Sequence, residues 1–128
     1  MRLLLDTHAA LWWWADSSEL GKSTIERLSD PSTMVFFSVV SGYEIFQKVR
    51  IGKLHLPDPL FQDLPSQVRH EGWEILPLGL AESIRAARID HCHRDPFDRL
   101  LAAQAEIHDL TVVTTNEFFD EAGFRTFW

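Results

Sequence analysis

The most informative part of the sequence runs from His93 to Ala105 and reads HRDPFDRLLAAQA. It predicts a loop that enters a helix. Asp95 suits the N-cap, because its side-chain oxygen can accept a backbone N–H that has no partner inside the helix. Pro96 suits the first helical position, where a missing N–H costs nothing. Apolar residues then recur at helical spacing and form one stripe: Phe97, Leu100, Leu101 and Ala105.

Asp98 falls in the first turn of this predicted helix, off the apolar stripe. A carboxylate in that place lies at the mouth of the helix and can face a cavity. It would also complement the positive end of the helix dipole, which by itself stabilises a helix by about 0.3–1 kcal/mol. The dipole is a sufficient explanation for Asp98 alone, so a functional interpretation depends on the other acidic residues of the chain.

The composition predicts one globular domain that spans residues 1–128. Hydrophobic residues make up 45% and charged residues 24% of the sequence, which is enough apolar material for a real core. The single cysteine, Cys92, excludes an intramolecular disulfide and fits a reducing compartment. No apolar run reaches membrane-spanning length, and the run after Met1 is too short for a signal peptide. We therefore expect a cytoplasmic protein without a membrane segment.

The net charge of the chain is −7, from 12 Lys and Arg against 19 Asp and Glu. This balance argues against binding nucleic acid mainly through a broad basic surface. It leaves open an enzyme that meets a phosphate through bound metal ions. An acidic chain can also attract a basic protein partner.

Outside the stretch 93–105, predicted strands and helices alternate along the chain. Arg2 to Leu5 is a short continuous apolar run, which suits a strand buried on both faces of a parallel sheet. The alternation implies right-handed βαβ crossovers and an α/β sandwich. The further expected strands are 33–38, 73–78, 110–114 and an edge strand within 124–128. The expected helices are 7–14, 21–28, one from Ser41, 60–71 with an interruption at Pro65, 81–89, and a turn or helix at 118–120.

Three carboxylates occupy one kind of place, at the end of a strand or early in the helix that follows it: Asp6, Glu44 and Asp98. Asn116 directly follows the strand 110–114. In a parallel sheet these positions lie at one edge, where three carboxylates would repel one another unless a cation neutralised them. Oxygen ligands suit Mg²⁺ or Mn²⁺, and such a site can activate a water for phosphodiester cleavage. Glu44 could instead form an exposed pair with Lys48, stabilising its helix by about 0.2–0.5 kcal/mol.

The sequence resembles the PIN-domain ribonucleases, specifically the VapC-like toxins of bacterial toxin–antitoxin pairs. The resemblance covers nearly the whole chain and rests on Leu3 to Ala9, Ser38 to Leu56, the stretch 93–105, Val113 to Asn116 and Trp128. It implies a three-layer α/β/α sandwich with a central parallel sheet, and Mg²⁺- or Mn²⁺-dependent endoribonuclease activity. It also implies a homodimer, an RNA substrate and inhibition by an antitoxin that covers the site with a basic side chain.

The resemblance assigns catalytic and metal-ligand roles to Asp6, Glu44 and Asp98. The fourth acid of the family aligns with Asn116, which keeps an oxygen ligand but loses a charge, so a second metal site should be weaker. Glu117 or Asp120 could substitute in part. The alternative function is a catalytically weakened binding module that still pairs with an antitoxin. A phosphatase with Asp6 as nucleophile fits less well, because His8 stands where a second aspartate is needed.

Several further residues have open roles. Thr7, Ser41 and Thr114 could position water or a carboxylate, or could be simple caps. Asp95 is an auxiliary acid or only an N-cap. Basic side chains could contact RNA phosphates or be solvated: Lys48, Lys53, Arg94 and Arg99. His91-Cys92-His93 lacks the ligand count of a structural zinc site, which favours loop packing or orientation of Asp95 and Asp98. Trp12 to Trp14 cannot share one helical face, so one lies at a surface contact or all pack within the chain.

Overall fold

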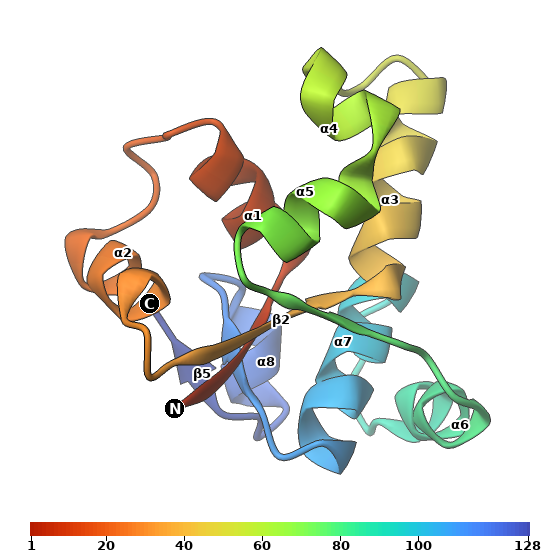
Figure 1. The fold of residues 1–128 in the computed structure, drawn as a ribbon. Coiled ribbons are helices and arrows are strands. Elements are labelled where there is room, and N and C mark those ends of the chain that lie inside the picture. The colour runs from red at the N-terminus through yellow and green to blue at the C-terminus, as the bar shows by residue number, and fades with distance from the viewer.

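A computed structural model describes all residues, 1–128, and its centre is a five-stranded parallel sheet (Figure 1). The strand order is β3-β2-β1-β4-β5, and every neighbouring pair is parallel. β1, the apolar run near the N-terminus, is therefore the central strand, as a strand buried on both faces should be. The strands are β1 Arg2–Leu5, β2 Met34–Ser38, β3 Glu74–Leu76, β4 Thr111–Val113 and β5 Thr126–Phe127.

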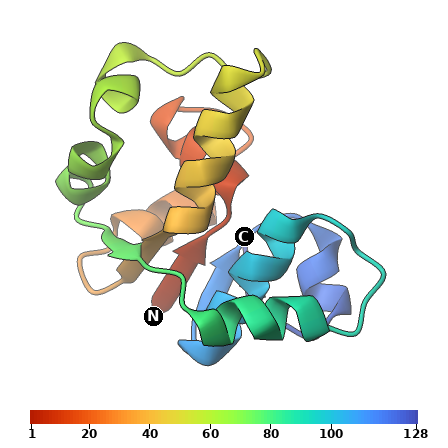
Figure 2. The same ribbon diagram turned by 90° about the vertical axis from the view of Figure 1, so that its right-hand side faces the viewer.

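Eight helices connect and cover these strands, and two of them matter most for the site. The long α3 follows β2 directly, and α7 begins at Pro96, directly after the predicted N-cap. In Figure 2, α7 lies beside α6. The helices are α1 Thr7–Trp14, α2 Lys22–Ser29, α3 Val39–Arg50, α4 Asp58–Gln62, α5 Leu64–His70, α6 Leu80–Arg88, α7 Pro96–Ile107 and α8 Glu117–Glu121.

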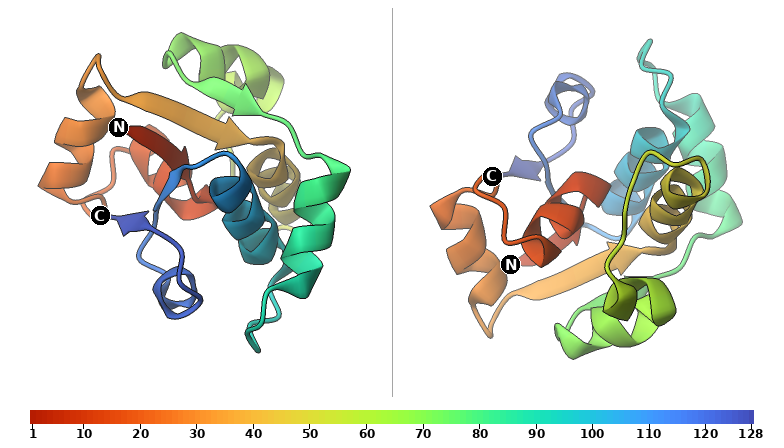
Figure 3. Two further views of the ribbon diagram at one scale, coloured as in Figure 1. Left: turned by 90° about the horizontal axis from the view of Figure 1, so that it is seen from below. Right: turned by 90° about the horizontal axis from the view of Figure 1, so that it is seen from above.

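The alternation of side chains along β1 divides the core into two clusters. Leu3 and Leu5 belong to the cluster that also holds residues of α1, α2, α4 and α5. Leu4 points to the opposite face, into a cluster with residues of α7 and α8. All three leucines are fully buried, and Figure 3 shows α4 and α5 on one side of the sheet and α7 and α8 on the other. The predicted three-layer α/β/α sandwich is thus confirmed.

The predicted elements are found with small shifts at their ends. The helix after β2 begins at Val39 rather than Ser41, because Ser38 is its N-cap and accepts the N–H of Val40. Pro65 lies in the first turn of α5 and separates it from α4, where its missing N–H costs nothing. The edge strand shortens to Thr126–Phe127. None of the helices combines the length and hydropathy that a bilayer span requires.

The three consecutive tryptophans all contact other residues of the chain, and each of them remains partly exposed. Trp12 meets Trp128 edge to face at 5.6 Å, and Trp14 contacts both Phe37 and Trp73. The indole N–H of Trp13 donates to Glu71 over 2.9 Å. The tryptophans therefore join α1 to the C-terminus, to β2 and to the segment before β3.

Candidate active site

The sheet topology brings the predicted acids to one edge. Asp6 follows the central strand β1 and caps α1, its Oδ1 accepting the Ala9 N–H over 2.7 Å. Asn116 follows the neighbouring strand β4 and caps α8. The chain leaves β1 towards β2 and β3 on one side, and later returns to β4 and β5 on the other. Ligands of open α/β sheets bind at such a switch in strand order, at the carboxyl ends of the strands.

The acids line one polar cleft of about 400 Å³ at this edge. Asp6 and Glu44 are each only 6% exposed, although charged carboxylates are rarely buried without a partner. Trp12 is the only hydrophobic residue in the lining. The cleft is lined by Asp6, Thr7, His8, Trp12, Glu44, Lys48, His93, Asp95, Asp98, Thr115 and Asn116. The structure thus brings Asp6, Glu44, Asp95 and Asp98 together with Asn116 and Lys48. Glu117 and Asp120, which the sequence offered as partial substitutes for a fourth acid, do not line the cleft.

Glu44 reaches this cleft from the second turn of α3, and both of its oxygens are held. The Thr7 hydroxyl donates to Oε1 over 2.6 Å, and the Lys48 ammonium lies 2.7 Å from Oε2. The hydroxyl oxygens of Thr7 and Ser41 are 2.9 Å apart. The sequence allowed an exposed pair of Glu44 with Lys48. The pair is formed, but the Glu44 carboxylate is buried rather than exposed. Thr7 acts on Glu44 as an orienting group, not as a helix cap.

Two carboxylates of the cleft lie in surroundings that disfavour their charge. Burial raises the pKa of Asp6 above its usual range, and the Thr114 hydroxyl and the Ala9 N–H only partly oppose that rise. Burial also raises the pKa of Asp98, against a hydrogen bond from His93 that lowers it. The charge of Glu44 acts on Asp6, and the charges of Asp95 and Asp6 act on Asp98. A bound cation would relieve this mutual repulsion.

The donor set fits a hard divalent cation. Carboxylate oxygens are the preferred ligands of Mg²⁺ and Mn²⁺, and the three acids named from the sequence face one cleft. The tightest group of candidate ligand atoms is a different one, His93, Asp95 and Asp98, whose atoms all lie within 4.8 Å of one another. Asp95 also caps α7, its Oδ1 accepting the N–H groups of Phe97 and Asp98. Cys92 is exposed and does not belong to this group.

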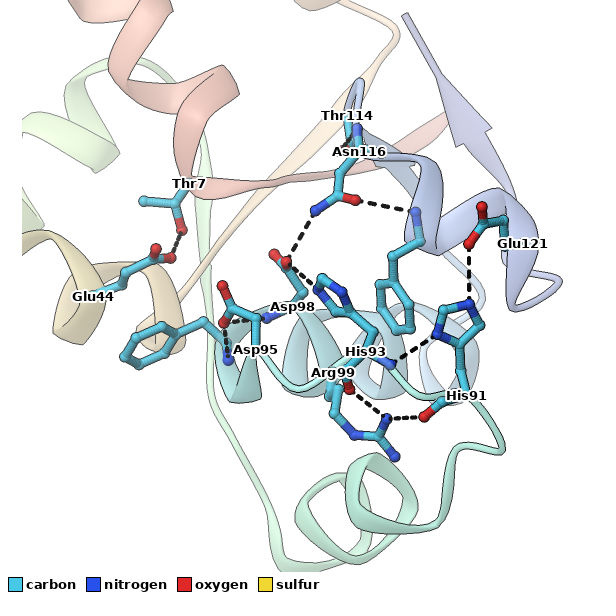
Figure 4. A network of polar contacts seen from close by, with 12 residues as sticks. Thr7, Glu44, His91, His93, Asp95, Asp98, Arg99, Thr114, Asn116 and Glu121 are labelled. Atoms are coloured by element: carbon cyan, nitrogen blue, oxygen red, sulfur yellow. Dashed lines mark hydrogen bonds and ion pairs between the residues drawn. The ribbon is translucent and has the colours of Figure 1, made fainter.

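Asn116 is placed differently from the metal ligand that the sequence suggested. Its side-chain oxygen accepts the N–H of Phe118 over 3.0 Å, as the N-cap of α8. Its amide NH₂ therefore faces the cleft and donates to Asp98 Oδ2 over 3.0 Å (Figure 4). The side-chain oxygen is engaged with the cap of α8, so Asn116 meets Asp98 as a hydrogen-bond donor in this arrangement.

Arg99 also departs from its predicted role as an RNA contact. Its guanidinium donates to the backbone carbonyls of five residues, at 2.6–3.4 Å: Ala86, Ala87, Ile89, His91 and His93. All five N–H donors of an arginine are thereby used inside the chain. Arg94, by contrast, is exposed. Arg99 ties the end of α6 and the following loop to α7. Arg94, Lys48 and Lys53 remain as candidate RNA contacts.

Some residues of the cleft were not singled out from the sequence. His8 and Trp12 line it from α1, and Thr115 lines it from the segment after β4. The sequence could have indicated two of these residues. His8 comes two residues after Asp6, and Trp12 lies one helical turn further on the same side of α1. The contact of His93 with Asp98, at 2.8 Å, is the orienting role that the sequence favoured for the 91–93 stretch.

The fold and the site define an open α/β protein with an acidic cleft at the carboxyl edge of a parallel sheet. The sequence profile described as "PIN domain" matches residues 3–125. The chain therefore belongs to the PIN domain family. A comparison with curated protein sequences finds no match.

Solved structures similar to this chain include VapBC toxin–antitoxin complexes. VapBC2 from Rickettsia felis, bound to promoter DNA, has a TM-score of 0.73 and 15% identity over 99% of this chain and 98% of that chain. DNA-bound VapBC from Salmonella typhimurium has a TM-score of 0.70 and 18% identity, covering 99% and 97%. FitAcB from Neisseria gonorrhoeae has a TM-score of 0.66 and 23% identity, covering 98% and 96%. At these identities the likeness shows the shared fold.

Proposed function

We propose that this chain is a metal-dependent endoribonuclease of the VapC type, the toxin of a toxin–antitoxin pair. The observation that carries the proposal is the cleft in which Asp6, Glu44 and Asp98 meet from three separate elements. PIN domains are generally nucleases, and the structural neighbours include VapBC complexes. RNA as the substrate, a homodimer as the assembly and the cytoplasm as the location belong to the same proposal and rest on the sequence resemblance.

Asp6, Glu44 and Asp98 would hold Mg²⁺ or Mn²⁺. When bound, the cation would lower the pKa of a water and stabilise charge on the phosphate. The protein's own part is to keep the acids in place. Thr7 and Lys48 fix both oxygens of Glu44, and the capping contact with Ala9 fixes Asp6. Lys48 lines the cleft and is about one-third exposed, so its ammonium can also meet an RNA phosphate.

The proposal is tested by cleavage of a single-stranded RNA with the purified chain in Mg²⁺ or Mn²⁺. Asp6→Asn keeps the oxygen that caps α1 but removes the charge, and we expect it to lose at least 99% of the cleavage rate, a barrier increase of about 2.7 kcal/mol. Asp16→Asn is the matched control, because Asp16 is an exposed acid outside the cleft. Equal cleavage by all three proteins would indicate a contaminating nuclease and remove the support for an enzyme.

The alternative function, a binding module with weakened catalysis, is favoured by one specific observation. Asn116 presents an amide NH₂ to the cleft where an acid would present an oxygen. A degenerate member of the family would show wild-type RNA cleavage no faster than that of Asp6→Asn. It would gain cleavage on Asn116→Asp, because that change restores a carboxylate while keeping an N-cap residue. The same assay therefore separates the two functions.

An apolar groove beside the cleft is the surface that we propose for the antitoxin. It has a volume of about 450 Å³, and seven of its twelve lining residues are hydrophobic. It shares His8, Trp12 and Lys48 with the acidic cleft. A peptide with apolar side chains in the groove would therefore continue over the carboxylates, where a basic side chain would find opposite charge. Leu54→Glu in the groove should weaken inhibition by a cognate antitoxin while RNA cleavage persists.

A further inference from the structure

One oxygen of Asp98 is held by two side chains from different parts of the chain. Oδ2 accepts the amide N–H of Asn116 over 3.0 Å, and it lies 2.8 Å from Nε2 of His93 (Figure 4). The other oxygen, Oδ1, makes no hydrogen bond with the protein. The Asp98 side chain is 17% exposed, so few waters can replace either contact. Asp98 is thereby fixed with one oxygen engaged and one oxygen free.

The orientation of the Asn116 amide follows from the backbone. The oxygen and nitrogen of an asparagine side chain are told apart by their partners. The N–H of Phe118 is a donor and lies 3.0 Å from one end of the amide, so that end must be the oxygen. The opposite end, which meets Asp98, must then be the NH₂. The Asn116 side chain therefore caps α8 with its oxygen and donates to Asp98 with its NH₂.

His93 is held in place from three directions. Its ring stacks on Phe118, with centroids 4.4 Å apart and planes 17° from parallel. Its backbone N–H donates to Nδ1 of His91 over 3.0 Å, and Nε2 of His91 contacts Glu121 at 3.0 Å. Its carbonyl accepts from Arg99 over 3.0 Å. The imidazole therefore meets Asp98 from a fixed position rather than from a mobile loop.

An aspartate at position 116 would change the charge balance of this contact. One oxygen would still cap α8, and the other would stand where the amide nitrogen now lies, 3.0 Å from Oδ2 of Asp98. Two carboxylate oxygens at that distance repel each other strongly in a buried site, unless a proton or a cation lies between them. The amide of Asn116 removes that repulsion and adds an attractive hydrogen bond in its place.

We propose that His93 and Asn116 are positioning residues that clamp Asp98 Oδ2, and that the chain consequently binds a single divalent cation. This inference rests on the proposed function, because it assumes that the cleft binds a cation at all. Asp98 offers its free oxygen, together with Asp6 and Glu44. The hydrogen bonds from His93 and Asn116 stabilise the negative charge of Asp98, so the cleft needs no second cation to neutralise it.

The test is the number of Mn²⁺ ions bound per chain, measured by electron paramagnetic resonance of free Mn²⁺ and by calorimetry. We expect one Mn²⁺ for the wild type and two for Asn116→Asp, which keeps the N-cap but turns a donor into a second carboxylate. Two ions on the wild type, or one ion on Asn116→Asp, would overturn the inference and leave the proposed function intact. No Mn²⁺ on the wild type would overturn the proposed function as well.

The role of His93 is tested separately by a conservative replacement. His93→Ala should weaken Mn²⁺ binding about 10- to 100-fold, the usual cost of losing a group that orients a metal ligand. His93→Gln retains a side-chain N–H donor, and we expect it to recover most of the lost affinity. His70→Ala, an exposed histidine on α5, is the matched control. Wild-type affinity in His93→Ala, or no recovery in a folded His93→Gln, would contradict the clamp.

Discussion

The role assigned to Arg99 leads to a prediction that separates a structural arginine from an RNA-binding one. In Arg99→Ala, five backbone carbonyls at the end of α6 and in the loop before α7 lose their donor. Four of these bonds measure 3.0 Å or less, and the fifth measures 3.4 Å. A hydrogen bond contributes about 0.5–1.5 kcal/mol net, and partly exposed carbonyls recover water, so we expect a loss of about 2–4 kcal/mol.

A loss of that size should lower the midpoint of thermal unfolding by roughly 10 °C in a domain of this length. The assay is urea and thermal unfolding followed by circular dichroism. Arg94→Ala is the control, because Arg94 is exposed, and its free energy of unfolding should change by less than about 0.5 kcal/mol. An Arg99→Ala variant that unfolds like the wild type, but binds RNA more weakly and with a smaller dependence on salt, would instead identify Arg99 as a phosphate contact.

Three further predictions follow from the cleft. Burial raises the pKa of Asp6, so without metal the folded state holds the Asp6 proton more readily than the unfolded state does. The free energy of unfolding should therefore fall as pH rises above about 3.8, the ordinary pKa of an aspartate. Asp6→Asn should therefore be more stable than the metal-free wild type at pH 7, and thermal unfolding at pH 3 should show that difference vanish. Mn²⁺ at 100 times its dissociation constant should stabilise the wild type by about 2.7 kcal/mol, an effect that excess EDTA reverses and that is absent in Asp6→Asn. Thr7→Val removes the hydroxyl that donates to Glu44 and should weaken Mn²⁺ binding about 10-fold by calorimetry; unchanged affinity would show that Glu44 needs no such support.

The elements that the sequence predicted well are those with a local signal. The apolar run in Arg2–Leu5 predicted a strand buried on both faces, and it is the central strand of the sheet. Asp95 and Pro96 mark the start of α7 through capping chemistry, which acts within a few residues. The meeting of the acids in one cleft then follows from the parallel sheet, because the carboxyl ends of all its strands share one edge.

The features that escaped prediction depend on contacts between distant parts of the chain. The sequence places an amide at position 116 but cannot orient it, because the orientation depends on Phe118 and Asp98 together. Arg99 looks like any exposed arginine until the end of α6 is brought against α7. The burial of the Glu44 carboxylate likewise depends on α1, whose Thr7 donates to it.

Removal and return of the metal in one sample shows whether RNA cleavage by this chain depends on a bound cation. The wild-type chain is treated with EDTA, dialysed, and assayed on a labelled single-stranded RNA before and after Mn²⁺ is added, beside Glu44→Gln treated in the same way. We expect no cleavage without metal, full recovery with Mn²⁺, and no recovery for Glu44→Gln. Cleavage that persists without metal, or a Glu44→Gln variant that recovers like the wild type, would contradict the proposed function.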